Sequence, residues 1–164
     1  MNFENIHELK EVQIKKGQIL QHKGVLNSKQ YFVKSGLLRS YAIDVKGKEH
    51  IFIFAPENWT IADGTSPQLP SELFIDAIED SVIYVQDKNF ETSDHSQPLF
   101  NRISVLQTRV IMLMSSSAIE RYEHFIETYA DIAQRVPQRM IASYLGITPE
   151  ALSKSKGQRI RKLS

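Results

Sequence analysis

The residues best placed to do chemistry lie near the C-terminal end of the chain, where two helices are predicted in quick succession. Pro137 suits the first position of a helix, and Gly146 suits the left-handed residue that ends one. Thr148 is a good N-cap for the next helix, and Pro149 fits its first position. Two helices joined by so short a turn are typical of a helix-turn-helix, although an ordinary helical hairpin has the same outline.

The second of these helices would enter the major groove of double-stranded DNA with its N-terminal end. There Lys154 can donate to guanine O6 and N7, and Glu150 can accept from cytosine N4. Nearby cations would contact phosphates, which supply affinity but not sequence specificity. The residues predicted to contact DNA are Thr148, Pro149, Glu150, Ser153, Lys154, Arg139, Lys156 and Arg159.

The charge distribution also favours a polyanionic partner. The chain carries 20 Lys and Arg against 19 Asp and Glu, but residues 151–164 contain five cations and no acid. The remaining 150 residues therefore sum to −4. A basic tail on an acidic body is typical of a segment that meets a polyanion, although a frayed and solvated terminus would carry the same charges.

The pattern of residues 1–97 predicts a β-rich domain that precedes the two helices in the sequence. Short apolar stretches recur there, and turn signals such as Lys16-Gly17 and Lys46-Gly47 separate several of them. Many short strands at this spacing are typical of a sandwich, jelly roll or barrel. The expected strands are Glu11–Lys15, Gln30–Ser35, Leu37–Asp44, Glu49–Phe54, Leu73–Ala77 and Ser81–Gln86.

A long helix is expected from Pro98 to Ser117, and a second from Ile119 to Tyr129, with a boundary at Val136 before the proline. Apolar residues of the long helix repeat in the pattern of a coiled-coil seam. The seam residues are Leu99, Ile103, Leu106, Val110 and Leu113. A second apolar face is formed by Phe100, Ile111, Met112 and Met114. A helix that is apolar on two sides needs two partners, so we favour a homodimer over a helix packed only on its own domain.

Composition excludes several other classes of protein. The chain has no cysteine, which removes disulfides, thiolate metal sites and cysteine nucleophiles. Its five histidines show neither HxH nor i,i+4 spacing, so no metal site is expected. Nucleophile elbows, P-loops and dinucleotide-binding motifs are also missing, so we expect no enzyme. The N-terminus lacks the features of a signal peptide and no apolar run could span a bilayer, so we expect a cytoplasmic protein with no membrane partner.

Several segments resemble one family. IASYLGITPEALSK is very similar to the helix-turn-helix of Crp/Fnr-type regulators, especially those of Bacteroidetes, and AIERYEHFIETYADIAQRVPQ resembles the segment before it. KKGQIL, YFVKSGLLRSYAIDVKGKEHIFIF and AIEDSVIYV resemble strands of the cyclic-nucleotide-binding β-roll. The resemblance implies an α+β fold with a double-stranded β-helix (a jelly roll) at 1–97, a dimerisation helix at 98–118 and a helix-turn-helix at 119–164. It also implies a transcription regulator that reads a two-fold symmetric DNA site as a homodimer.

The chain departs from this family at the ligand site. An Arg-Ser/Thr pair holds the phosphate of cyclic AMP in members that bind it, and this pair aligns here with Ser71 and Glu72. Between Lys48 and Lys88 there are eight acids and no Lys or Arg. Burying a phosphate without a paired cation costs several kcal/mol, so we predict no cofactor and the loss of cyclic AMP and cyclic GMP binding.

Other ligands and other roles stay open. Arg39 or Arg121 could still reach the ligand site from elsewhere in the chain. The β-roll could also serve only as a scaffold, or hold a neutral or cationic small molecule as an effector. The residues expected near such a molecule are Trp59, Asp63, Ser71 and Glu72.

The second helix departs from the family as well. Its core position three residues after Leu152, Ile or Val in the family, is Ser155, and Gly157 costs about 1 kcal/mol in a helix interior. The helix is therefore expected to end early or to pack loosely. The β-hairpin wing of many relatives is also missing, since only a basic tail follows. These features favour an alternative function, a protein-interaction module with a degenerate helix-turn-helix.

Overall fold

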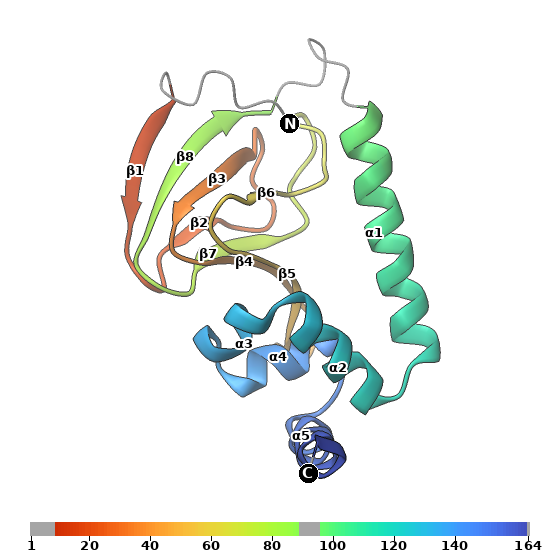
Figure 1. The fold of residues 1–164 in the computed structure, drawn as a ribbon. Coiled ribbons are helices and arrows are strands. Elements are labelled where there is room, and N and C mark those ends of the chain that lie inside the picture. The colour runs from red at the N-terminus through yellow and green to blue at the C-terminus, as the bar shows by residue number, and fades with distance from the viewer. Residues whose placement is uncertain (1–8, 89–95, 164) are drawn as a thin grey trace. The chain divides into compact units, whose positions relative to one another are not determined.

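The computed structural model describes residues 9–88 and 96–163, which form eight strands and five helices (Figure 1). The chain divides into two compact units, residues 1–93 and residues 94–164. The first unit holds all eight strands, and the second holds all five helices. The long helix, which the sequence analysis treated as a segment of its own, thus belongs to the same unit as the helices that follow it.

The strands of the first unit form two four-stranded antiparallel sheets, with the orders β1-β8-β3-β6 and β2-β7-β4-β5. Six strands lie within one or two residues of the predicted ones. The two that sequence patterns missed, β2 and β6, have three residues each, too few for an alternating pattern to show. The strands are β1 (Lys10–Ile14), β2 (Ile19–Gln21), β3 (Lys29–Ser35), β4 (Leu38–Ile43), β5 (Glu49–Ala55), β6 (Thr60–Ala62), β7 (Phe74–Ala77) and β8 (Ser81–Asp87).

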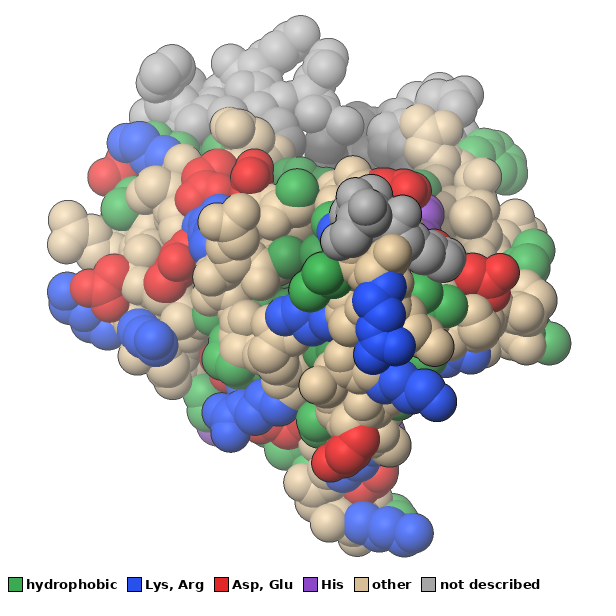
Figure 2. Space-filling model, turned by 60° about the horizontal axis from the view of Figure 1, so that its bottom comes forward, with side chains coloured by type: hydrophobic (Ala, Val, Ile, Leu, Met, Phe, Trp, Pro, Cys, Tyr) green, Lys and Arg blue, Asp and Glu red, His purple; other side chains and the backbone are tan. Residues whose placement is uncertain are grey.

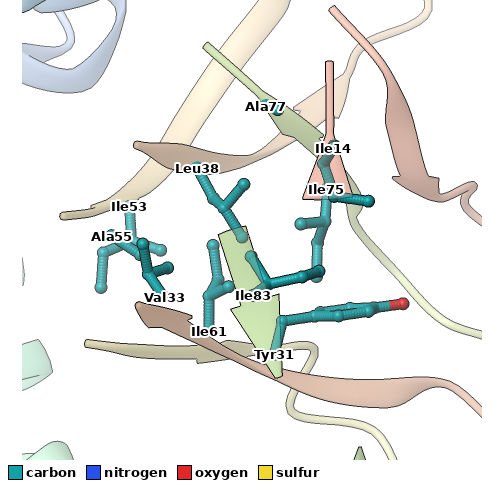
Figure 3. Packing of buried hydrophobic residues seen from close by; sticks show 10 residues of the cluster. All are labelled: Ile14, Tyr31, Val33, Leu38, Ile53, Ala55, Ile61, Ile75, Ala77 and Ile83. Carbon is teal, nitrogen blue, oxygen red and sulfur yellow. The ribbon is translucent and has the colours of Figure 1, made fainter. Parts of the chain in front are cut away.

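The inner faces of the two sheets meet in one apolar core (Figure 3). Val33 and Ile83 pair across β3 and β8 in one sheet, and Leu38 and Ala77 pair across β4 and β7 in the other. The residues of this core are Ile14, Tyr31, Val33, Leu38, Ile53, Ala55, Ile61, Ile75, Ala77 and Ile83. Their burial at about 25 cal/mol for each Å² of apolar surface is what stabilises the roll.

A close approach between Gly36, in the bend after β3, and Ser81, the first residue of β8, fixes the start of β4. Gly36 has a φ of 96°, and a Cβ placed on it would lie 2.2 Å from the Ser81 Oγ. The same hydroxyl oxygen accepts a hydrogen bond from the Leu37 backbone N–H. Only glycine allows both the left-handed backbone and this contact.

The second unit begins with a long helix and continues with four shorter ones. These are α1 (Ser96–Ser115), α2 (Ala118–Thr128), α3 (Ala130–Arg135), α4 (Gln138–Leu145) and α5 (Pro149–Leu163). A capping box at Ser117 and Glu120 starts α2. The short helix α3 was not predicted from the sequence. None of the helices among the described residues is long and apolar enough to cross a membrane.

An aromatic cluster joins α2 to α4. The rings of Phe125 and Tyr144 lie 5.5 Å apart, and those of Tyr129 and Tyr144 lie 6.0 Å apart. Leu145 and Leu152, from α4 and α5, are buried in the same unit. The packing of α5 against α2 and α4 therefore fixes where the first turns of α5 point.

Candidate nucleic-acid interface

The turn between α4 and α5 has the geometry that the sequence predicts. Gly146 ends α4 with φ 64° and ψ 32°, a left-handed conformation. Its N–H donates to the Ser143 backbone oxygen, and the Ile147 N–H donates to the Ala142 oxygen. Val136, with φ −114° and ψ 145°, is extended as expected before a proline. Pro137 is the N-cap of α4 rather than its first helical residue, a shift of one position from the prediction.

Thr148 caps the start of α5, as predicted. Its Oγ1 accepts a hydrogen bond from the Ala151 N–H at 3.2 Å. The carboxylate of Glu150 lies in the first turn, where a hydrogen bond from its own backbone N–H and a second from Thr148 lower its pKa. A carboxylate at this end of a helix is also favoured by the helix dipole. Glu150 is therefore ionised and held at the tip of the helix.

The expectation that α5 ends early or packs loosely was wrong. The helix continues through Gly157 to Leu163. Leu152 and Ser155 are only 1% and 2% exposed, and both lie on the side of α5 that packs within the unit. The Ser155 hydroxyl donates to the Ala151 backbone oxygen at 2.9 Å, which satisfies a polar group that would otherwise be costly to bury.

Most of the residues predicted to contact DNA are accessible. Lys156 and Arg159 are both half-buried along the second half of α5. The exposed ones in the turn, in the first half of α5 and on α4 are Thr148, Pro149, Glu150, Ser153, Lys154 and Arg139. Residues 94–164 carry ten Lys and Arg against six Asp and Glu, a net +4, whereas the first 93 residues carry −3. Figure 2 shows several Lys and Arg side chains on the face that is turned forward there, with Asp and Glu side chains among them.

The β-roll residues predicted to surround a small molecule divide into two groups. Asp63 is 3% exposed, and its carboxylate accepts four hydrogen bonds, from the Thr65 N–H and hydroxyl and from the Glu72 and Leu73 N–H groups. Ser71 is 1% exposed and its hydroxyl donates to the His22 oxygen. These two side chains hold the loop before β7 in place.

The other two residues of that set face water. The Glu72 side chain is 70% exposed and lies 3.7 Å from the Lys23 ammonium. Trp59 precedes β6, is 38% exposed, and donates its backbone N–H to the Pro56 oxygen. The structure thus brings Asp63, Ser71 and Glu72 together through the loop backbone, and places Trp59 in the turn before β6.

This part of the β-roll is not free of cations, which corrects the expectation from the charge count. The Lys88 ammonium donates to the Ser28 hydroxyl and to the backbone oxygens of Asp63 and Thr65. Burial lowers the pKa of Lys88, and the charge of Asp63 opposes that shift. Lys88, which directly follows β8, therefore holds the loop after β6 through its backbone oxygens. The sequence offered no signal of this role.

The two arginines considered as partners for a bound phosphate, Arg39 and Arg121, are engaged elsewhere. The Arg39 guanidinium donates to both carboxylate oxygens of Asp76, at 2.8 and 2.9 Å, and to Glu49 at 2.6 Å. Arg121 belongs to the helical unit and donates to three backbone oxygens of that unit. Within residues 9–88 and 96–163 there is also no group of His, Asp and Glu side chains that could hold a metal ion.

The exposed apolar face of α1 is turned partly away from the predicted seam. Leu106 and Leu113 are half-buried, and nothing is described of the Leu99 side chain. Six large apolar residues of α1 are more than 40% exposed. Five of them share one face of the helix, two from the predicted seam (Ile103 and Val110) and three from the second face (Phe100, Ile111 and Met114), and Val105 lies outside it. Arg109, on another side of the helix, contacts α4, a role that the sequence analysis missed.

Solved structures with this arrangement of strands and helices were found across almost the whole chain. FixK2 from Bradyrhizobium japonicum is 19% identical, with a TM-score of 0.72 over 94% of this chain and 85% of that one. A transcriptional regulator of the CRP/FNR family from Thermus thermophilus is 18% identical, with a TM-score of 0.75 over 93% and 87%. The chain has the Crp/Fnr fold.

Other structures with the Crp/Fnr fold agree. A mutant of CooA from Carboxydothermus hydrogenoformans is 21% identical, with a TM-score of 0.70 over 96% of this chain and 78% of that one. No protein-family model matches the chain, and no protein of curated function matches it in sequence. The α+β architecture with a jelly-roll unit, predicted from the resemblance, is thus confirmed for the fold.

Proposed function

We propose that the protein is a sequence-specific DNA-binding transcription regulator that acts as a homodimer. The observation that carries the proposal is the α4–turn–α5 geometry. A left-handed glycine and a threonine cap set α5 against α2 and α4, and the first turns of α5 expose polar side chains on a unit of net charge +4. This is the arrangement by which a helix-turn-helix presents its second helix to the major groove.

Three exposed side chains of α5 would read base edges. Lys154 would donate to guanine, and ionised Glu150 would accept from the amino group of cytosine. Ser153 can pair with either kind of edge. Arg139, Lys156 and Arg159 would contact phosphates and fix the register of the helix without reading sequence. A buried serine in the core of α5 was one reason to consider a degenerate helix-turn-helix that only binds protein. The Ser155 hydroxyl has a hydrogen-bond partner, which supports the DNA-binding proposal instead.

We propose that the partner on α1 is a second copy of this chain. Five large apolar residues of one helix face are exposed, which is costly in water unless a partner covers them. A parallel pair of such helices would bury both faces and place two α5 helices for a two-fold symmetric site.

The proposed regulator does not bind cyclic AMP or cyclic GMP through their phosphate. Arg39, Lys88 and Asp63 already have the partners that a phosphate would have to replace. Releasing either of the buried charges, Arg39 or Asp63, from its hydrogen bonds would cost several kcal/mol. We propose no cofactor, and an effector, if one acts on the roll, would be a neutral or cationic small molecule.

The test is selection from a random pool of double-stranded DNA by the purified full chain, without added nucleotide, at physiological salt. We expect enrichment of a two-fold symmetric site with half-sites about one helical turn apart. Affinity for that site should fall steeply between about 50 and 200 mM salt, because several phosphate contacts release counterions.

Two lysine variants sharpen this test. Lys154→Gln should lose about 1–3 kcal/mol on the selected site and relax the base preference at one position. Lys46→Gln removes the same charge from the exposed hairpin tip of the β-roll and should bind like the wild type. Failure to enrich any site, or equal losses in both variants, would refute sequence-specific reading by α5.

A further inference from the structure

The connection between α1 and the other helices differs from the rest of the helical unit. The helix α5 packs extensively against α2 and α4, and α2 packs against α3 and α4. Within residues 96–163, α1 makes no comparably extensive contact with any of these helices. Because α1 packs so little against the other helices, its position relative to them depends on a few specific contacts. Two arginines provide such contacts.

Arg109 carries the first contact, from the middle of α1 to the end of α4. Its guanidinium lies 4.0 Å from the centre of the Tyr144 ring, and one of its N–H groups donates to the Tyr144 backbone oxygen at 3.1 Å. The same ring packs against Phe125 and Tyr129 in the centre of the helical unit. Arg109 therefore reaches the cluster that holds α2 and α4 together.

Arg121 carries the second contact, from α2 to the ends of two other helices. Its guanidinium donates to the backbone oxygens of Leu113 at 2.6 Å and Ser116 at 3.0 Å, where α1 ends. It also donates to the Leu145 oxygen at 3.1 Å, where α4 ends. Carbonyl groups at a helix C-terminus lack partners and carry partial negative charge, so one planar cation ties both helix ends together.

We propose that Arg109 and Arg121 are positioning residues that hold the pair α4–α5 at a fixed distance and angle from α1. This inference rests on the proposed function. If α1 pairs with its copy, the separation of the two α5 helices in the dimer follows from these two contacts. The arginines then determine which half-site spacing the dimer accepts, without touching DNA themselves.

The planar guanidinium is essential to both contacts, so Arg109→Lys and Arg121→Lys are the variants of choice. A lysine keeps the charge but cannot stack flat on Tyr144 while donating to its oxygen, and cannot reach three carbonyls in fixed directions. We would measure binding of the wild type, both single variants and the double variant to the selected half-site, alone and paired at several spacings.

The wild type should prefer one spacing by about tenfold or more, the size of an ordinary coupling between two sites. The double variant should keep its affinity for the single half-site and lose most of the preference between spacings. An unchanged preference would overturn the inference. So would an equal loss on the half-site and on the paired sites, because the arginines would then only support the fold or touch DNA.

A second measurement needs no DNA and separates this inference from the proposed function. The chain has no cysteine, so Thr108→Cys on α1 and Gln158→Cys on α5 accept two spin labels. With labelled chain diluted in unlabelled chain, we expect a narrow distance distribution that broadens in the double variant. A distribution equally narrow in both would overturn the inference even if DNA binding is found. Broadening without any DNA binding would overturn the proposed function and the role of the arginines in half-site spacing. The two arginines would then only hold α1 against the other helices.

Discussion

Individual buried side chains hold the loops of the β-roll in place, and Asp63 is the clearest example. Burial alone would raise the pKa of this carboxyl, but hydrogen bonds from Thr65, Leu73 and Glu72 outweigh that effect and hold it below its ordinary value. A carboxylate that meets several N–H donors stabilises the loop around it. Asp63, which the sequence predicted to lie near a ligand, therefore stabilises the loop itself.

Asp63→Asn should destabilise the protein by about 2–3 kcal/mol, because the amide nitrogen leaves backbone N–H donors without an acceptor. The folded pKa of Asp63 is lowered, so its contribution is complete above the unfolded pKa and is lost as the pH falls through the folded one. The difference from wild type should thus shrink below about pH 4. Urea unfolding from about pH 2.5 to 7 measures it, and Glu72→Gln, at an exposed carboxylate, is the control. A constant difference over this range would contradict the prediction.

The ion pair of Arg39 and Asp76 gives a second prediction at this scale. Both side chains are almost fully buried, at 7% and 11% exposure. Arg39→Met should cost about 3–5 kcal/mol, because it leaves the Asp76 charge buried without its partner. The double variant Arg39→Met with Asp76→Leu removes both charges and should recover most of this loss in urea unfolding. A double variant as unstable as the single one would show that Asp76 is not the source of the cost.

Among the elements, α5 shows how local chemistry and packing combine. The start of α5 follows from the left-handed Gly146 and the cap at Thr148, both of which are local preferences of these residue types. Its continuation through Ser155 and Gly157 depends on packing against α2 and α4, which outweighs the weak helix preference of these two residues. The helix is therefore longer than its sequence alone suggests.

Replacement of Gly146, before α5, and of Gly157, within α5, should change the stability in opposite directions. Gly146→Ala should destabilise by about 1 kcal/mol or more, because alanine is strained at a φ of 64°. Gly157→Ala should stabilise by about 0.5–1 kcal/mol, since the added methyl group meets nothing within 4 Å and the backbone is already helical. Thermal unfolding of the two variants under the same conditions tests both signs. A stabilising Gly146→Ala would show that the turn is not held in the left-handed conformation.

For the whole molecule, the main feature is that the net charge differs in sign between the two units. The β-roll unit is acidic and closed around one core, and the helical unit is basic and leaves the apolar face of α1 uncovered. We propose that these two surfaces bind partners of different chemistry, an anion on α5 and an apolar surface on α1. The proposed homodimer on DNA supplies both.

Val110→Glu should weaken self-association by about tenfold or more, because it places a charge in each copy of the shared apolar face. Thr108→Glu adds the same charge to an exposed position of α1 away from that face and should have little effect. Sedimentation of both variants over a range of concentrations gives the dimer dissociation constants. A monomeric wild type would contradict the proposed dimer, and equal weakening by both variants would show that the effect is not specific to this face.

What the sequence by itself determined is local. The turn at Gly146, the cap at Thr148, the extended residue Val136 and six of the eight strands follow from backbone preferences and periodic burial that act within a few residues. The segments that contain these elements resemble those of Crp/Fnr-type regulators in the same order along the chain. That resemblance predicted the α+β fold, because the order of helices and strands is characteristic of a fold.

What only the tertiary structure decided is how distant residues are paired. On sequence evidence Asp63 and Arg39 could have served a ligand, and each is engaged by residues from other parts of the chain. No signal in the sequence indicated that Lys88 would bond to Ser28 and to the loop after β6. The contacts of Arg109 and Arg121 with helix ends 24 to 35 residues away left no local signal either. The physical reason is that partners for charges are chosen by three-dimensional proximity and desolvation, which no short-range pattern in a sequence encodes.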